Sequence, residues 1–176
     1  MNELFGDNKN SGAQFSECGK FRYQLWRVWD EAKPKALVIG LNPSTANADK
    51  PDPTITNLKI ALVKLGYGGF VIVNCFPIIS PKPGILKGVD INDDENTNNQ
   101  YIVGEAAKDC QVVIFAWGAF PVVGKSGIDK RWESLFPSAQ CFGKSKNGKP
   151  WHPLFLMWSG NIKAPSLINY FNESGN

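Results

Sequence analysis

A continuous apolar run that breaks into a polar turn constrains the fold of this chain more than any other feature. Residues 36–39 read Ala-Leu-Val-Ile, without a helical period, and Gly40 opens the turn Leu41-Asn42-Pro43-Ser44-Thr45. Such a run is typical of a strand buried on both faces of a parallel sheet. Because Pro43 fixes the next backbone angle, we expect Asn42 at a rigid position just beyond the carboxyl end of this strand. The same residues also fit a tight turn with a Ser or Thr cap.

Two further apolar runs, residues 70–76 and 111–117, predict buried strands of the same kind. Between and after them lie three predicted helices. Asp52 can cap the first, in which apolar residues recur at helical spacing, and acidic residues occupy the first turn of the second. The predicted helices span residues 52–65, 93–108 and 128–135. Strands that alternate with helices predict an α/β fold, here a three-layer αβα sandwich with a central, mainly parallel sheet.

The two ends of the chain carry weaker signals. Residues 1–20 are polar and have no period, so a loose N-terminal arm is expected. Residues 21–29 alternate and are rich in aromatic side chains, which predicts a half-exposed strand, antiparallel to the main sheet or at its edge. A short strand near residues 139–142 and a weak helix near residues 166–171 are expected. With no internal repeat and no linker, residues 1–176 are predicted to form a single domain.

The composition argues against several classes of protein. With 43% hydrophobic residues, 20% charged residues and a net charge of +3, the chain resembles an ordinary soluble globular protein. It shows neither a membrane-spanning stretch nor a signal peptide, so we expect a cytoplasmic monomer without a membrane partner. Four scattered cysteines and one histidine predict no metal site. The glycine motifs of phosphate loops and dinucleotide sites are missing, so no cofactor is expected.

Polar or glycine residues stand where each predicted strand ends. Asn42 follows the first strand, Asn74 the second and Gly118 the third, and the only histidine, His152, lies in a later loop. Open parallel sheets bind ligands beyond these carboxyl ends, so we expect one site there. A lone histidine can be structural, but a histidine before proline at this edge favours a functional role.

A lysine-rich loop precedes this histidine. It contains Lys144, Lys146 and Lys149 together with two glycines. A basic loop of this kind is either a solvated surface or a site of phosphate contact.

Taken in order, these motifs resemble those of the uracil-DNA glycosylase superfamily. Gly40-Leu41-Asn42-Pro43 resembles the first motif of its mismatch-specific branch, Val73-Asn74-Cys75-Phe76-Pro77 the base-reading strand, and His152-Pro153-Leu154 the second catalytic motif. Order and spacing match over residues 36–156. The chain is more similar still to an uncharacterised bacterial and phage domain family marked by a Leu-Asn-Pro-Ser-Thr-Ala turn and a late His-Pro-Leu.

The resemblance implies a monofunctional DNA glycosylase with a uracil-DNA glycosylase-like fold. Such an enzyme flips a nucleotide out of the DNA stack and hydrolyses the bond between base and sugar. By this resemblance, Asn42 positions the attacking water and His152 donates a hydrogen bond to the base oxygen that gains charge. The implied base-binding residues are Asn74, Phe76 as a stacking partner, Pro43, Ser44 and Gly118. The implied DNA-contacting residues are Lys144, Lys146, Lys149 and Leu154.

Two departures from the superfamily pattern narrow the expected substrate. Asn42 stands where the fastest branch has an aspartate, and Leu154 replaces the small residue of the usual intercalating turn. Both favour selective removal of a modified pyrimidine, such as a bulky base of phage DNA, over removal of plain uracil. A role in defence against phage would follow. The alternatives are a module that binds modified DNA without cleaving it, an enzyme acting on free nucleosides or nucleotides, and a structural protein in which these residues form turns.

Overall fold

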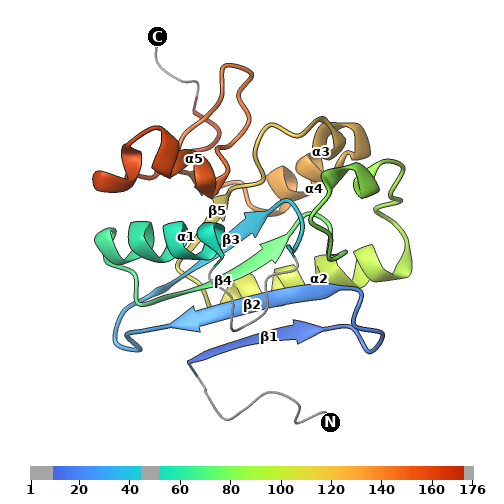
Figure 1. Cartoon of the computed structure of the whole chain (residues 1–176), viewed down its shortest axis with the longest axis horizontal. Helices are drawn as coiled ribbons and strands as arrows, with labels where there is room; N and C mark the ends of the chain where they lie inside the picture. The colour runs from blue at the N-terminus through green and yellow to red at the C-terminus, as the bar shows by residue number, and fades with distance from the viewer. Residues whose placement is uncertain (1–9, 45–51, 173–176) are drawn as a thin grey trace.

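A seven-stranded mixed sheet runs through the centre of the protein, seen here in a computed structural model that describes residues 10–44 and 52–172 (Figure 1). The strand order is β1-β2-β4-β3-β5-β6-β7. Strands β3 to β6 are mutually parallel, and β1, β2 and β7 are added antiparallel at the two sides. The strands are β1 (Ser11–Phe15), β2 (Arg22–Val28), β3 (Lys35–Gly40), β4 (Gly69–Asn74), β5 (Val112–Phe115), β6 (Gln140–Cys141) and β7 (Ile168–Asn169).

The predicted buried strands are confirmed as β3, β4 and β5, and the α/β class with them. The expectation of a mainly parallel sheet is only half right, because three of the six ladders are antiparallel. Strand β3 lies between β4 and β5, so the order reverses there. The carboxyl ends of β3 and β5 therefore form the crevice in which an open parallel sheet binds its ligand.

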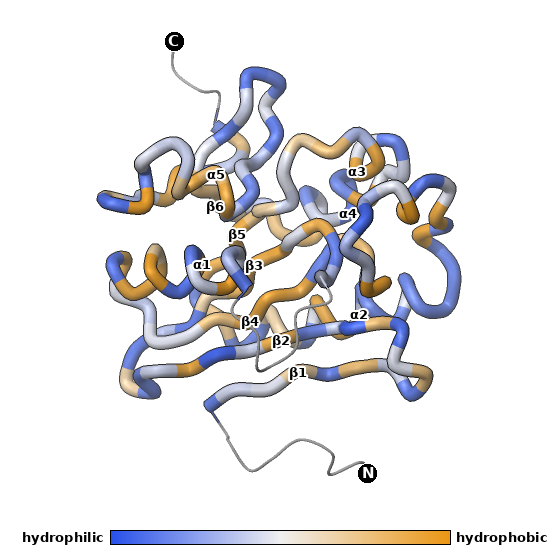
Figure 2. Tube along the Cα trace, viewed as in Figure 1, coloured by the Kyte–Doolittle hydropathy of each residue, from blue (hydrophilic) through white to orange (hydrophobic). Residues whose placement is uncertain are grey.

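Helices cover both faces of the sheet. Along β3, Leu37 and Ile39 pack into one apolar core, and Ala36 and Val38 pack into another on the opposite face. The first core includes side chains of α2 (Asp94–Lys108), α3 (Pro121–Ser126) and α4 (Ile128–Leu135), and the second those of α1 (Pro53–Lys64) and α5 (Pro153–Trp158). Figure 1 shows the two groups of helices on opposite sides, and Figure 2 shows the hydrophobic strands between them.

Aspartate caps start the two longest helices, and the cap of the first, Asp52, is confirmed as predicted. The carboxylate of Asp52 accepts a hydrogen bond from the backbone N–H of Thr54 at 2.7 Å, and Pro53 occupies the first helical position of α1. Asp93 accepts from the N–H of Asn96 at 2.7 Å at the start of α2. These bonds satisfy amides that have no partner within the helix.

Two expectations at the chain ends are corrected, and a third is confirmed. Residues 11–15 of the expected loose arm form β1, which pairs with β2. Residues 21–29 contain β2, which pairs antiparallel with β4 of the main sheet, one of the two placements expected for it. Residues 1–9 lie outside the described part of the chain. The helix expected near residues 166–171 is wrong, because Ile168–Asn169 pairs with β6 as β7. Both added strands are held by backbone hydrogen bonds and bury few side chains, so they leave no apolar pattern in the sequence.

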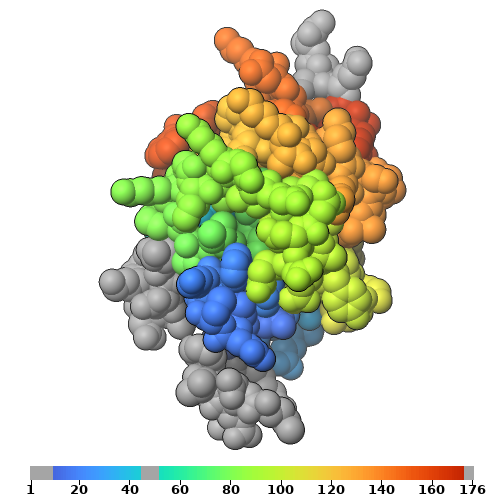
Figure 3. Space-filling model, turned by 90° about the vertical axis from the view of Figure 1, so that its right-hand side faces the viewer, coloured from blue at the N-terminus to red at the C-terminus, as the bar shows by residue number. Residues whose placement is uncertain are grey.

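The segment that follows β4 closes one side of the molecule. It contains the short helix η1 (Pro83–Leu86), and Figure 3 shows it lying against the segment that includes α3. The backbone N–H of Ser80 in this segment donates to the carbonyl of Pro43 at 3.0 Å. The turn after β3 is thereby tied to the loop after β4. In the described ranges, no helix is long and apolar enough to cross a membrane.

Candidate functional site

A cavity of about 610 Å³ opens at the carboxyl ends of the parallel strands, on the face covered by α1 and α5. This volume is typical of sites for small ligands and cofactors. The polar lining comes from the ends of β3 and β4, the loop after β5, the start of β2 and the caps of α1 and α5. Its members include Arg22, Asn42, Asp52, Asn74, Gly118 and His152.

Small residues at the strand ends make room for the cavity. A Cβ on Gly40 would lie 2.8 Å from Oδ1 of Asn74, so glycine allows this amide to fold over the end of β3. Gly118 has a φ of 79° and a Cβ there would lie 3.3 Å from that of His152. A side chain at Gly118 would therefore be strained and would displace the histidine.

Asn42 is held in one orientation by the loop after β4. Its side-chain nitrogen donates to the backbone carbonyls of Ser80 at 2.9 Å, Pro43 at 3.2 Å and Ile78 at 3.4 Å. Because the nitrogen is committed to these carbonyls, the side-chain oxygen is the part of the amide that is left to accept a hydrogen bond from a ligand or water.

His152 caps the short helix α5. Its Nδ1 accepts a hydrogen bond from the backbone N–H of Leu154 at 3.2 Å. A ring nitrogen that accepts a hydrogen bond carries no proton, so the neutral ring carries its proton on Nε2, which acts as a donor. Burial lowers the pKa of His152 below its ordinary value of 6.5, and the negative charge of Asp52 opposes this shift. The histidine is therefore neutral at neutral pH.

Acidification is expected to destabilise the protein through His152. Since the pKa is lower in the folded state, the unfolded chain takes up the proton first, and the free energy of unfolding falls as the pH drops below 6.5. Urea unfolding between about pH 5 and pH 7.5 should show that the free energy of unfolding falls more steeply with acidification in the wild type than in His152→Asn. This variant keeps a capping side chain but cannot titrate. Since His152 is the only histidine, equal pH dependence in the two proteins would contradict this assignment.

Asp52 is the one carboxylate among the described cavity residues. One oxygen caps α1 through the N–H of Thr54, and the other accepts a hydrogen bond from the hydroxyl of Ser44 at 2.8 Å. The helix cap was predicted from the sequence, but the position of Asp52 in the cavity was not. The carboxylate is thus fixed at the start of α1, where its negative charge raises the pKa of His152 and opposes the effect of burial.

Of the predicted site residues, six line this one cavity: Asn42, Ser44, Asn74, Gly118, His152 and Leu154. Two predicted base contacts, Phe76 and Pro43, do not line the cavity. Phe76 is fully buried in the core on the opposite face of the sheet, because the chain turns beyond Asn74, and it cannot stack on a ligand. Pro43 is buried outside the cavity lining, where its carbonyl accepts the hydrogen bonds that hold the turn.

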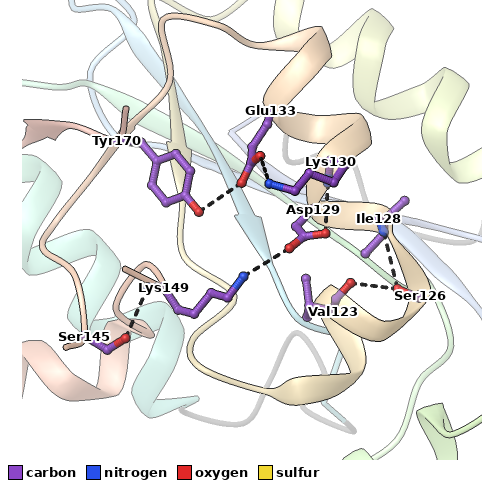
Figure 4. A network of polar contacts seen from close by, with 9 residues as sticks. All are labelled: Val123, Ser126, Ile128, Asp129, Lys130, Glu133, Ser145, Lys149 and Tyr170. Atoms are coloured by element: carbon purple, nitrogen blue, oxygen red, sulfur yellow. Dashed lines mark hydrogen bonds and ion pairs between the residues drawn. The ribbon is translucent and has the colours of Figure 1, made fainter. Parts of the chain in front are cut away.

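The lysines of the loop before His152 have mostly internal partners. Lys149 forms an ion pair with the buried carboxylate of Asp129 in α4 at 3.1 Å (Figure 4). Lys144 donates to the backbone carbonyls of Tyr170 and Asn172. None of the three lines the cavity, and only Lys146 points its charge into solvent without a partner among the described residues. The loop is thus anchored to α4 and to the C-terminal segment.

Lys149→Met is expected to lower the free energy of unfolding by about 1 to 3 kcal/mol. Asp129 is 2% exposed, so the substitution leaves a buried carboxylate without its cation. The partial exposure of Lys149 keeps the effect below that of a fully buried pair. Lys146→Met, in the same loop but exposed, is the matched control and should change stability by less than about 0.5 kcal/mol in urea unfolding. Equal effects of the two substitutions would show that the ion pair is not what matters.

Two groups of cavity residues were not predicted from the sequence. Arg22 lies at the start of β2, which no local pattern connects to the ends of β3 and β4. Aromatic side chains surround the mouth: Phe120, Phe155 and Trp158 are 37%, 39% and 76% exposed. Phe155 and Trp158 stand in the apolar segment 153–158 that follows His152, and exposed aromatic side chains of this kind are typical of a binding surface.

The fold and the cavity define an α/β protein with a cavity at the carboxyl edge of its sheet. The chain belongs to the family described as protein of unknown function (DUF1643), whose model matches residues 22–154. That range contains every polar cavity residue discussed above. No curated protein and no solved structure matches the chain. Among the described residues, no cluster of three or more His, Cys, Asp or Glu side chains could hold a metal ion.

Proposed function

We propose that this protein is a monofunctional DNA glycosylase that hydrolyses the N-glycosidic bond of a modified pyrimidine, of the kind carried by some phage DNA, flipped into the cavity. One observation carries the proposal. Asn42, Asn74 and His152, whose motifs resemble those of the uracil-DNA glycosylase superfamily, come from three distant segments and line a single cavity. The internal hydrogen bonds of the described residues leave one polar atom of each side chain available to a ligand: Oδ1 of Asn42, Nδ2 of Asn74 and Nε2 of His152.

The proposed reaction replaces the bond between base and C1′ with a bond between water and C1′. Water adds its oxygen to C1′, the glycosidic electron pair leaves with the base, and the proton lost by the water ends on the base through solvent. The transition state resembles an oxocarbenium ion with negative charge on the departing base. The Oδ1 of Asn42 would accept a hydrogen bond from the attacking water and so fix its position.

His152 would stabilise the charge that develops on the base. A neutral imidazole with its proton on Nε2 donates a hydrogen bond without needing to be ionised. The lowered pKa keeps the ring in this form at neutral pH. A glycosylase that also cuts the strand needs an amine to attack the sugar, and no lysine lies among the described residues of the cavity, which supports a monofunctional enzyme.

A free nucleoside or nucleotide is the second candidate substrate. It is favoured by the internal partners of Lys144 and Lys149, which reduce the positive charge available to hold a DNA backbone. Binding of DNA by phosphate contacts weakens steeply with salt, whereas a nucleoside bound in the cavity should be insensitive to salt.

Release of bases from a panel of DNA duplexes tests the proposal. The panel carries uracil, mismatched thymine, hydroxymethylated and glucosylated cytosine, and carboxylated cytosine, and alkali converts each abasic site to a strand break. Breakage on one modified substrate, lost in Asn42→Ala, would support the proposal. Binding of DNA without breakage would instead indicate a binding module, and hydrolysis of free nucleotides alone would favour the second candidate.

A further inference from the structure

The side chain of Arg22 is buried at one end of the cavity. The residue is 4% exposed and lines the cavity, and its Nε has no hydrogen-bond partner among the described residues. No ion pair within the described ranges includes it. Burial of a charged group without compensation is costly, so an arginine in this position needs a functional explanation.

A bulge in β2 turns this side chain toward the cavity. Gln14 pairs with Gln24, but the next residue, Phe15, pairs with Arg22, so Tyr23 is an extra residue on β2. The hydroxyl of Tyr23 donates to Glu95 of α2 on one face of the sheet, and Arg22 lines the cavity on the other. Bulges commonly redirect side chains in this way next to binding sites.

No described residue of the cavity forms an ion pair with Arg22. Asp52, the nearest candidate, already accepts hydrogen bonds from Ser44 and from the N–H of Thr54, and its charge reaches Arg22 only at a distance. Burial lowers the pKa of Arg22, but a guanidinium remains charged at every physiological pH. A positive charge therefore stays in the cavity wall.

A second unpaired donor lies on the neighbouring strand. Asn74, at the end of β4, is 3% exposed, lines the cavity, and its side-chain nitrogen has no partner among the described residues. Strands β2 and β4 are paired, so the two donors lie at the same end of the cavity. This end needs a ligand group that is anionic and rich in acceptors, and carboxylates and phosphates have this chemistry.

We infer that the ligand of this cavity carries an oxyanion, a carboxylate or a phosphate, which Arg22 and Asn74 bind at the β2–β4 end. The inference rests on the proposed function only in taking the cavity as the substrate site. Under that function the oxyanion is an acidic substituent of the modified base. If the substrate is a free nucleotide, the oxyanion is its phosphate.

Arginine side-chain NMR tests the inference directly. The chain contains three arginines, Arg22, Arg27 and Arg131, so the three Nε–H signals can be assigned with single substitutions. The intact protein is titrated with cytidine, with 5-carboxycytidine and with cytidine 5′-monophosphate. We expect one of the two acidic probes to shift the Arg22 signal and cytidine to leave it unchanged, and the responding probe names the source of the oxyanion.

Affinity provides a second measurement. Arg22→Gln should weaken binding of the responding probe by about 10- to 100-fold, the range expected for hydrogen bonds to a charged group. Arg27→Gln is the matched control, because Arg27 is on the same strand and donates instead to the backbone carbonyl of Trp26 at 2.8 Å. Its affinity should equal that of the wild type.

The outcomes separate this inference from the proposed function. An Arg22 signal that neither acidic probe moves, or equal affinity of Arg22→Gln and the wild type, would overturn the oxyanion site. Binding of an acidic probe at Arg22 with no base released from any DNA would keep the site and refute the glycosylase. Release of a neutral base at an unchanged rate in Arg22→Gln would support the glycosylase and refute the oxyanion site.

Discussion

His152→Asn is expected to lower kcat for base release by about 10²- to 10³-fold, while the protein remains as stable as the wild type at neutral pH. The loss follows from removal of a preorganised hydrogen-bond donor to a developing charge. Stability is retained because the Oδ1 of asparagine is a good N-cap and can accept the hydrogen bond that Leu154 now donates to Nδ1 of His152. Single-turnover release from the responding duplex, together with urea unfolding, measures both quantities.

His152→Ala is the comparison that separates catalysis from capping. This substitution removes both the donor and the cap, so it should match His152→Asn in activity but lose about 1 kcal/mol of stability as well. If His152→Asn released the base at the wild-type rate, His152 would be a capping residue alone. If only His152→Ala were inactive, the cap rather than the imidazole proton would be what the site needs.

The side chain of Asn57 connects α1 to the start of α5. The side chain of Asn57 in α1 is 3% exposed and donates to the carbonyl of Pro153 at 3.2 Å. This bond connects the helix that Asp52 caps to the residue next to His152. Asp52 caps α1 and His152 caps α5, so the hydrogen bond of Asn57 fixes these two side chains relative to each other.

The parts of the fold that were predictable are those whose side chains record their surroundings. Strands β3 and β4 are buried on both faces, which leaves continuous apolar runs, and α1 and α2 begin at aspartate caps. Strands β1 and β7 and the short helix α3 bury few side chains, and what holds the two strands is backbone hydrogen bonding to partners distant in sequence. Such pairing leaves no local signal.

The candidate site was predictable to the same extent. Asn42, Asn74 and Gly118 follow parallel strands, so topology alone brings them together. The position of Arg22 depends on the pairing of β2 with β4 in particular and on a bulge within β2, and the residues around Arg22 indicate neither. Phe76 failed for a related reason: beyond the end of β4 the chain turns, and alternation no longer tells which face a side chain occupies.

Arg22→Met is expected to raise the free energy of unfolding by about 1 to 3 kcal/mol, although most substitutions of buried residues lower it. The guanidinium is 4% exposed and its Nε has no partner among the described residues, so its removal relieves an uncompensated desolvation cost. Methionine is flexible and apolar, so it can adapt to the largely apolar wall of the cavity. Urea unfolding in a buffer free of phosphate and carboxylate measures the change.

Arg27→Met, on the same strand, is expected to lower the free energy of unfolding, whereas Arg22→Met should raise it. The guanidinium of Arg27 donates to the carbonyls of Trp26 and Gly12, so its loss should lower stability by about 1 kcal/mol. Addition of the responding oxyanion at about 100 times its dissociation constant should stabilise the wild type by about 2.7 kcal/mol and Arg22→Met by far less. A residue that weakens the empty protein and strengthens the occupied one is retained for its ligand, and a destabilised Arg22→Met would show instead that the guanidinium serves the fold.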